Sequence, residues 1–262
     1  MIQENTDRFI VIDDARLYAL HLDLFPGRPT IVLLHDSLGC VQLWRDWPQK
    51  LAAALQCNVL AYDRLGYGLS DPMPAADRPV QYLEAEAAVL HRVLTGLGIT
   101  QAILFGHSDG GSIALIAASQ YPGGIQAVVC EAGHIFVEDV TLTGIAQAIT
   151  AYQTTDLPAR LARYHGDKTG MIFKAWTETW MQSDFRSWNI EHYLPGITCP
   201  LLFIQGEADE YGTIAQVDRT IAQVSGKAIK FMIAGVGHTP HKEAPALVLD
   251  RVKVFIQALG VL

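Results

Sequence analysis

Basic side chains are scarce in this chain of 262 residues, and nowhere are they clustered. Lys and Arg together number 19 against 27 Asp and Glu, which gives a formal net charge of −8. A nucleic acid or an anionic membrane surface would require Lys and Arg gathered on one face to contact phosphates. The charge therefore argues against both partners and leaves a small-molecule substrate as the expected ligand.

Long apolar runs are also absent. No run approaches the roughly 18 residues that a helix needs to span a bilayer. The first five residues, Met1 to Asn5, lack the basic start and the apolar core of a signal peptide. We therefore expect a cytoplasmic protein without a membrane segment.

Cysteine is rare, and the four cysteines lack the spacing of metal ligands. They are Cys40, Cys57, Cys130 and Cys199. Two of them lie in or beside apolar runs, which favours buried free thiols over disulfides. None precedes a helix in a basic setting, which argues against a thiolate nucleophile. We expect neither a metal site nor a cofactor.

Hydrophobic residues, by contrast, make up half of the chain, enough for one large core. Short apolar runs typical of strands buried on both faces recur at 31–34, 59–62, 102–105, 127–130, 201–204 and 230–233. Amphipathic stretches of helical length separate most of them, at 43–56, 81–97, 112–120, 213–224 and 245–259. This alternation predicts a doubly wound α/β fold with a mostly parallel sheet.

Two further segments complete the predicted architecture. Residues 8–13 and 16–24 alternate in polarity and indicate a hairpin at the sheet edge, which brings the sheet to about eight strands. Residues 134–196 contain helical patterns and no convincing strand, so we expect a helical cap inserted after the sixth strand. The predicted core then comprises residues 1–133 and 197–262.

Polar residues follow each apolar run, and in an open α/β sheet the reacting groups gather beyond the carboxyl ends of the strands. The segment after run 102–105 reads Gly106-His107-Ser108-Asp109-Gly110-Gly111. It has the Gly-x-Ser-x-Gly form, in which glycines permit a sharp turn that lifts the serine hydroxyl clear of the sheet. Because the motif lies between a strand and a helix, Ser108 is the candidate nucleophile.

A serine hydroxyl needs a base to take its proton and a carboxylate to orient that base. The chain order serine, acid, histidine is met by Ser108, Asp209 and His238, each just after a separate apolar run. Alternatives remain open near these positions: Glu131 and Glu210 for the acid, and His241 for the base.

A wider set of residues matches one known family. It comprises residues 33–35 with Gly39, Asp63-Arg64 with Gly66, Gly68 and 70–71, the segment 106–110, Gly206 with Asp209, and Gly237-His238. With these residues the chain resembles the α/β-hydrolase family, in particular its serine esterases and lactonases, over nearly its whole length. The resemblance implies that Ser108, Asp209 and His238 form the catalytic triad. It also implies an oxyanion hole made by the backbone N–H groups of Ser37 and Asp109.

The chain departs from that family at one position, since Asp36 stands after His35 where glycine is usual. Glycine there eases the bend that aims the oxyanion donor, and Asp tolerates a positive φ better than most residues. We expect Asp36 and Asp109 to disfavour an anionic group near the scissile carbonyl. His35 and His107 are interpreted as structural residues, and Asp63-Arg64 as a brace for a loop.

These observations predict a serine hydrolase that cleaves a small carboxylic ester, lactone or thioester through an acyl-enzyme intermediate. Trp176 and Trp180 are candidate pocket residues. Carbon–carbon bond hydrolysis and cofactor-independent oxygenation are alternatives on the same residues. A ligand-binding receptor with residual hydrolysis is an alternative of another class. A dinucleotide site is disfavoured, because the G-x-G-x-x-G spacing is absent. The pattern does not indicate the oligomeric state.

Overall fold

The apolar runs form one sheet in the computed structural model, which describes residues 6–261. Its eight strands are β1 Thr6–Ile12, β2 Ala15–Leu22, β3 Thr30–Leu34, β4 Asn58–Tyr62, β5 Ala102–His107, β6 Ile125–Glu131, β7 Leu201–Gly206 and β8 Ala228–Ile233. Their order across the sheet is β1-β2-β4-β3-β5-β6-β7-β8. The pairs β1–β2 and β2–β4 are antiparallel, and the others are parallel. The predicted fold class is thus confirmed.

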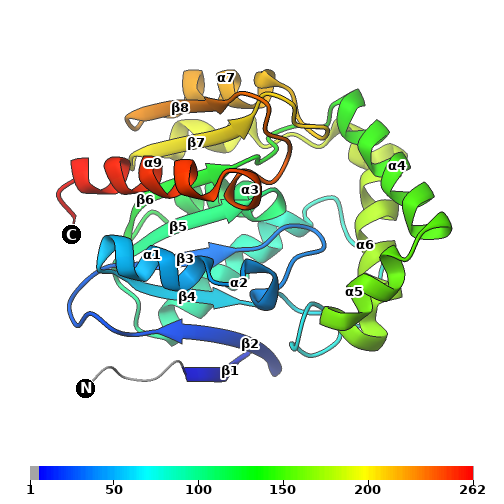
Figure 1. Cartoon of the computed structure of the whole chain (residues 1–262), viewed down its shortest axis with the longest axis horizontal. Coiled ribbons are helices and arrows are strands. Elements are labelled where there is room, and N and C mark those ends of the chain that lie inside the picture. The colour runs from blue at the N-terminus through cyan, green and yellow to red at the C-terminus, as the bar shows by residue number, and fades with distance from the viewer. Residues whose placement is uncertain (1–5, 262) are drawn as a thin grey trace.

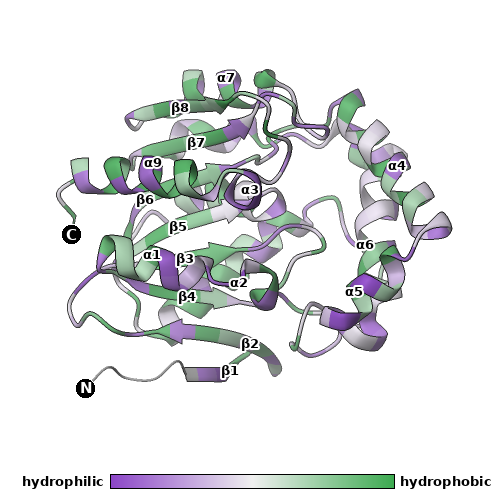
Figure 2. Cartoon of the chain, in the orientation of Figure 1, coloured by the Kyte–Doolittle hydropathy of each residue, from purple (hydrophilic) through white to green (hydrophobic). Residues whose placement is uncertain are grey.

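Helices cover both faces of this sheet, which explains the continuous apolar runs. On one face, α1 (Trp47–Leu55) and α9 (Pro245–Ala258) pack against the sheet. On the other face lie α2 (Tyr82–Gly96), α3 (Asp109–Gln120) and α7 (Ile214–Gln223). Strands β3, β4 and β5 are buried along their whole length and are drawn largely in the hydrophobic colour in Figure 2.

The predicted edge hairpin is present, and its turn has a physical cause. Asp13 and Asp14 both have positive φ, at 49° and 65°, a conformation that Asp tolerates better than most residues. The predicted helix 43–56 is split into the 3₁₀ turn η1 (Val41–Trp44) and α1, because Arg45 has a φ of 54° between them. The short helix α8 (Pro240–Glu243) was not predicted.

A helical insertion follows β6, as predicted. It contains α4 (Asp139–Thr154), α5 (Leu157–His165), η2 (Gly166–Lys168), α6 (Thr169–Met181), η3 (Ser183–Ser187) and η4 (Glu191–Gly196). Figure 1 shows α4, α5 and α6 to one side of the sheet, facing the ends of its central strands. Within the described residues, the only β-bridge of this insertion pairs Phe136 with Asn189.

Two further expectations concern cysteine and the membrane. The four cysteines are free thiols, three of them buried and Cys199 partly buried. Across residues 6–261, no helix combines the length and the apolar character that crossing a bilayer requires.

Candidate active site

Ser108 occupies a strained turn between β5 and α3. Its φ is 54° and its ψ is −118°, a backbone conformation that few residues other than glycine adopt. A Cβ atom on Gly106 would lie 2.0 Å from the carbonyl oxygen of Gly110, and one on Gly110 would lie 2.0 Å from that of Leu34. The two glycines of the motif are therefore required by close packing.

The structure brings the three predicted triad residues together. Nε2 of His238 lies 3.0 Å from Oγ of Ser108, and Nδ1 of His238 lies 2.9 Å from Oδ1 of Asp209. Both distances are within hydrogen-bond range, so a His238 that donates from Nδ1 can accept the serine proton at Nε2. This is the arrangement in which a serine hydroxyl can be deprotonated.

Asp209 lies at the end of the β7 loop and its side chain is 1% exposed. Its Oδ1 also accepts the backbone N–H groups of Tyr211 at 2.8 Å and Gly212 at 3.2 Å. Burial alone would raise the pKa of the Asp209 carboxyl, but the hydrogen bond to His238, the charge of His238 and the Tyr211 N–H lower it. The carboxylate is thus held ionised next to the histidine.

The rival residues are placed elsewhere. Oε2 of Glu131 lies 2.5 Å from Nδ1 of His241, so the alternative acid and the alternative base contact each other. Oε2 of Glu210 accepts the backbone N–H of His238 over 3.2 Å and does not reach the imidazole ring through any hydrogen bond among the described residues. Of the predicted acids, only Asp209 is hydrogen-bonded, among the described residues, to the imidazole ring that contacts Ser108.

The two residues predicted to supply oxyanion donors lie beside the same cavity. Ser37 and Asp109 line the same cavity as Ser108, and Asp109 is the first residue of α3, whose positive end faces this region. The N–H groups of Leu38 and Gly39 donate instead to Asp36. Asp36 is not among the described residues with positive φ, so its backbone does not need the usual glycine.

A cavity of about 470 Å³ opens beside the serine. It is lined by Asp36, Ser37, Leu38, Ser108, Asp109, His134, Thr141, Ile145, Leu157, Arg160, Trp176, Trp180, Glu210, Tyr211, His238 and Thr239. The insertion contributes a largely apolar part of this wall, including the predicted Trp176 and Trp180. His134, Arg160 and Tyr211 were not predicted as pocket residues. The fold of the insertion places the first two and the loop after β7 places Tyr211, and neither has a sequence signature.

The two acidic side chains next to the proposed oxyanion hole each contact a basic side chain. Nη2 of Arg64 lies 3.4 Å from Oδ2 of Asp109, and both side chains are 1% exposed. Oδ2 of Asp36 lies 3.3 Å from Nδ1 of His107. The charge of Arg64 offsets that of Asp109, so the negative charge near the cavity is smaller than the sequence suggests. Asp63 braces its loop by accepting the N–H groups of Val41 and Leu69.

One group of described side chains has a composition that could hold a metal. Candidate ligand atoms of His107, Glu131 and His241 lie within 4.8 Å of one another, and all three residues are buried. Glu131 and His241 are already in contact, however, and the nitrogens of His107 face Asp36 and the backbone oxygen of His238. The geometry is that of hydrogen-bonded pairs.

The sheet carries a serine, a histidine and a carboxylate in hydrogen-bond contact beyond the carboxyl ends of its strands. This combination is typical of one class of hydrolases. Residues 31–251 match the family model described as the alpha/beta hydrolase family. The chain belongs to this family, which the resemblance in sequence predicted.

Individual relatives differ in the reactions that their names state. The chain is 29% identical over 215 residues to serine hydrolase BPHL of Mus musculus, across 80% of this chain and 73% of that protein. It is 25% identical to 2-succinyl-6-hydroxy-2,4-cyclohexadiene-1-carboxylate synthase of Salmonella typhimurium, across 89% of this chain and 96% of that protein. The crystal structure of the enol-lactonase from Burkholderia xenovorans LB400 has a TM-score of 0.73 at 20% identity, covering 95% of this chain and 100% of that chain. This last likeness establishes the fold alone.

Proposed function

We propose that the protein is a serine hydrolase that cleaves a small carboxylic ester, lactone or thioester through an acyl-enzyme intermediate. The observation that carries this proposal is the line of hydrogen bonds from Asp209 through His238 to Ser108. Ser108 and His238 also line the 470 Å³ cavity, so a bound molecule would lie against both.

In the proposed reaction, Ser108 transfers its proton to Nε2 of His238 while Oγ bonds to the substrate carbonyl carbon. The oxyanion that forms is bound by the N–H groups of Ser37 and Asp109, and removing one such donor typically costs about 3 kcal/mol. His238 then protonates the leaving alkoxide or thiolate. A water molecule that gives its proton to His238 attacks the acyl group and restores Ser108.

The cavity supports a substrate of modest size. Its volume lies within the 300–1,000 Å³ that is usual for small-molecule sites. Trp176 and Trp180 are proposed to contact the apolar part of the substrate. The proposed location of the protein is the cytoplasm.

Comparison of the wild type with Ser108→Ala tests the proposal. Labelling is measured with a fluorophosphonate probe, and turnover is measured with panels of p-nitrophenyl esters, lactones and thioesters. Labelling and turnover are expected in the wild type, with turnover reduced by at least about 10⁴-fold in Ser108→Ala. Ser183→Ala, at an exposed serine of the insertion, is the matched control and should behave as the wild type.

The alternatives give other outcomes. Labelling of Ser108 without turnover of any ester, lactone or thioester would favour the ligand-binding receptor or a carbon–carbon bond substrate. Turnover that survives in Ser108→Ala would contradict the serine mechanism altogether.

A further inference from the structure

The imidazole of His107 lies between two loops of the proposed active site. His107 is the last residue of β5 and is almost completely buried. Its Nδ1 lies 3.3 Å from Oδ2 of Asp36, and its Nε2 lies 2.9 Å from the backbone oxygen of His238. Asp36 precedes Ser37, the proposed oxyanion donor, and His238 is the proposed base. One ring therefore joins the two loops that must act together.

Both contacts of this ring are made to hydrogen-bond acceptors, namely the ionised carboxylate of Asp36 and a backbone carbonyl. A neutral imidazole donates from one nitrogen only, so His107 satisfies a carboxylate and a carbonyl together only as the imidazolium. Burial would lower the pKa of His107, but the hydrogen bond and the charge of Asp36 raise it above its usual value. Burial likewise opposes ionisation of Asp36, yet His107 holds the pKa of that carboxyl below its usual value.

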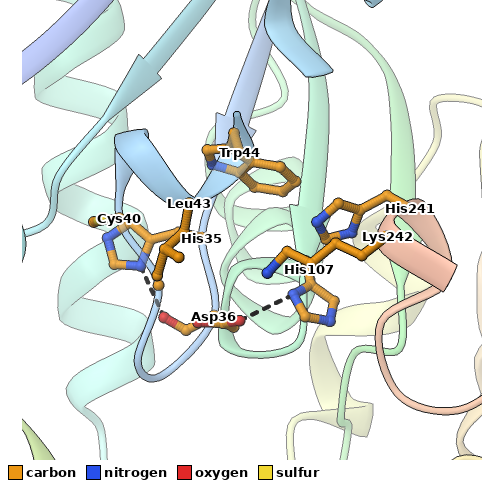
Figure 3. A pocket seen from close by; sticks show the side chains of 9 residues that line it. His35, Asp36, Cys40, Leu43, Trp44, His107, His241 and Lys242 are labelled. Atoms are coloured by element: carbon orange, nitrogen blue, oxygen red, sulfur yellow. Dashed lines mark hydrogen bonds and ion pairs between the residues drawn. The ribbon is translucent and has the colours of Figure 1, made fainter. Parts of the chain in front are cut away.

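Asp36 is anchored in the oxyanion loop at several atoms. Its Oδ1 accepts the N–H of Leu38 at 3.0 Å, and its backbone oxygen accepts Nη2 of Arg64 at 2.8 Å. A Cβ atom on Gly39 would lie only 2.5 Å from Oδ1 of Asp36. Figure 3 shows Asp36 between the rings of His35 and His107, with an interaction drawn to each. A glycine at position 36 could make none of the carboxylate contacts.

We propose that Asp36 and His107 are positioning residues that hold the loop of Ser37 and the loop of His238 at a fixed separation during acyl transfer. This inference rests on the proposed function. It assigns a purpose to the aspartate that stands where the family usually has glycine. Positioning of this kind has large kinetic weight, since a displacement of about 1 Å can cost about 10²-fold in rate.

Other charged groups around His107 do not replace this contact. They come from separate elements. His35 follows β3, Glu131 ends β6, His238 lies in the loop after β8, and His241 and Lys242 belong to α8. Glu131 is hydrogen-bonded to His241 at 2.5 Å, and the ring of Trp44 packs on His241 with centroids 4.7 Å apart. The charge of Glu131 favours protonated His107 and that of Lys242 opposes it, but neither is hydrogen-bonded to His107 among the described residues.

Two substitutions of Asp36 separate positioning from general stability. Asp36→Gly removes both carboxylate contacts, and we expect kcat to fall by about 10-fold to 100-fold while KM changes by less than about 3-fold. Asp36→Asn keeps an acceptor for Leu38 and offers an N–H donor to a neutral His107, so it should restore most of kcat. Activity of the wild type should fall at alkaline pH as His107 loses its proton, and this fall should be absent from Asp36→Asn.

Glu131→Gln is the matched control, because it alters the neighbouring buried carboxylate–histidine pair and removes neither partner of the Asp36–His107 contact. It takes away only the charge of Glu131, which supports protonated His107 less than Asp36 does. Glu131→Gln should lower thermal stability. It should not show the fall in kcat at nearly constant KM that is expected of Asp36→Gly. Nitrogen-15 NMR of labelled histidine gives a readout independent of activity. We expect His107, assigned by its loss in His107→Gln, to carry two N–H protons at pH 7.5 in the wild type and one in Asp36→Asn.

Three results would overturn the inference. They are a neutral His107 in the wild type at pH 7.5, an unchanged kcat in Asp36→Gly, or the same kinetic pattern in Glu131→Gln as in Asp36→Gly. Failure of the proposed function is recognised separately: if the fluorophosphonate does not label Ser108 in the wild type, both proposals fall. If it does label Ser108 and Asp36→Gly has normal kcat, only the positioning role is wrong.

Discussion

The indole N–H of Trp180 donates to the hydroxyl oxygen of Tyr82 over 2.9 Å, and this bond joins the helical insertion to the core. The hydroxyl of Tyr82 in turn lies 3.1 Å from Oδ2 of Asp109, the oxygen that also accepts from Arg64. All four side chains are buried. A chain of hydrogen bonds therefore runs from the wall of the cavity to the residue after Ser108.

Tyr82→Phe tests the importance of this chain. The substitution leaves the Trp180 N–H without its acceptor and Asp109 without one donor. Since an unsatisfied buried polar group typically costs about 1–3 kcal/mol, we expect the free energy of unfolding to fall by about 2 kcal/mol. We also expect kcat/KM to fall, because Asp109 supplies a proposed oxyanion donor. Urea denaturation and steady-state kinetics measure the two effects.

Tyr62→Phe is the control for that substitution. Tyr62 is equally buried, but its hydroxyl has no hydrogen-bond partner within the described residues. Removing this hydroxyl should leave stability unchanged or raise it slightly. Equal losses in the two variants would show that the Trp180–Tyr82–Asp109 contacts contribute nothing specific.

Much of the architecture could be predicted from sequence because its signals are local. In β5 the residues before Gly106 are all apolar. A strand needs such a run because helices cover both faces of the sheet. Ser108, Asp209 and His238 follow the parallel strands β5, β7 and β8, whose carboxyl ends lie along one edge of the sheet. Their proximity was therefore predictable once the strands were placed.

The contacts that were missed depend on distant segments. Tyr82 meets Asp109 and Trp180, which lie 27 and 98 positions away. His165 meets Gly68 across 97 positions. No periodicity or motif reports such pairings, because they are set by how separate segments pack in three dimensions. The Asp36–His107 pair, which joins the loop after β3 to the end of β5, was missed for the same reason, although Asp36 was recognised as a departure from the family.

Asp209→Asn and Glu131→Gln together identify the catalytic acid. Asn at position 209 can hydrogen-bond the wrong tautomer of His238, so we expect kcat to fall by about 10⁴-fold. Glu131 contacts His241 and not His238, so Glu131→Gln should retain kcat within about 3-fold and lower stability by about 2 kcal/mol. Pre-steady-state acylation kinetics measure the change in rate, and urea denaturation measures the change in the free energy of unfolding. The reverse pattern would make Glu131 the acid.

Gly110→Ala tests the close packing of the turn at Ser108. The added methyl group would lie 2.0 Å from the carbonyl oxygen of Leu34, so the turn must shift. We expect a loss of about 3 kcal/mol or more in unfolding free energy and loss of fluorophosphonate labelling. Gly123→Ala is the control, because a Cβ atom there would have no neighbour within 4 Å. If Gly110→Ala is labelled at the wild-type rate, the packing constraint is wrong.

His165 anchors the insertion to the core in a way that acid should weaken. Its Nδ1 accepts the backbone N–H of Gly68 at 2.9 Å, so Nε2 donates to the carbonyl of Leu38 at 3.0 Å. This pattern requires a neutral ring, because a protonated Nδ1 could not accept from Gly68. Burial, reinforced by the charge of Lys168, lowers the pKa of His165 below its usual value.

The consequence for stability follows from proton linkage. Below about pH 6.5 His165 of the unfolded chain binds a proton, whereas His165 of the folded chain stays neutral. The free energy of unfolding therefore falls as the pH falls toward the lowered pKa of the folded state. Gln offers a donor and an acceptor without titrating, so His165→Gln should reduce the acid slope by up to about 1.4 kcal/mol per pH unit. Burial also lowers the pKa of His35, His134 and His241, so some slope should persist.

Denaturation of the wild type and His165→Gln between pH 5 and 8 measures this difference in slope. The exposed His192 provides the control, and His192→Gln should follow the wild-type profile. Because Leu38 lies next to Ser37, loss of the His165 bond should also lower kcat at acid pH in the wild type more than in His165→Gln. Parallel stability profiles for wild type and His165→Gln would show that the pKa of His165 is the same in the folded and the unfolded chain. The acid sensitivity would then have to arise from the other buried histidines.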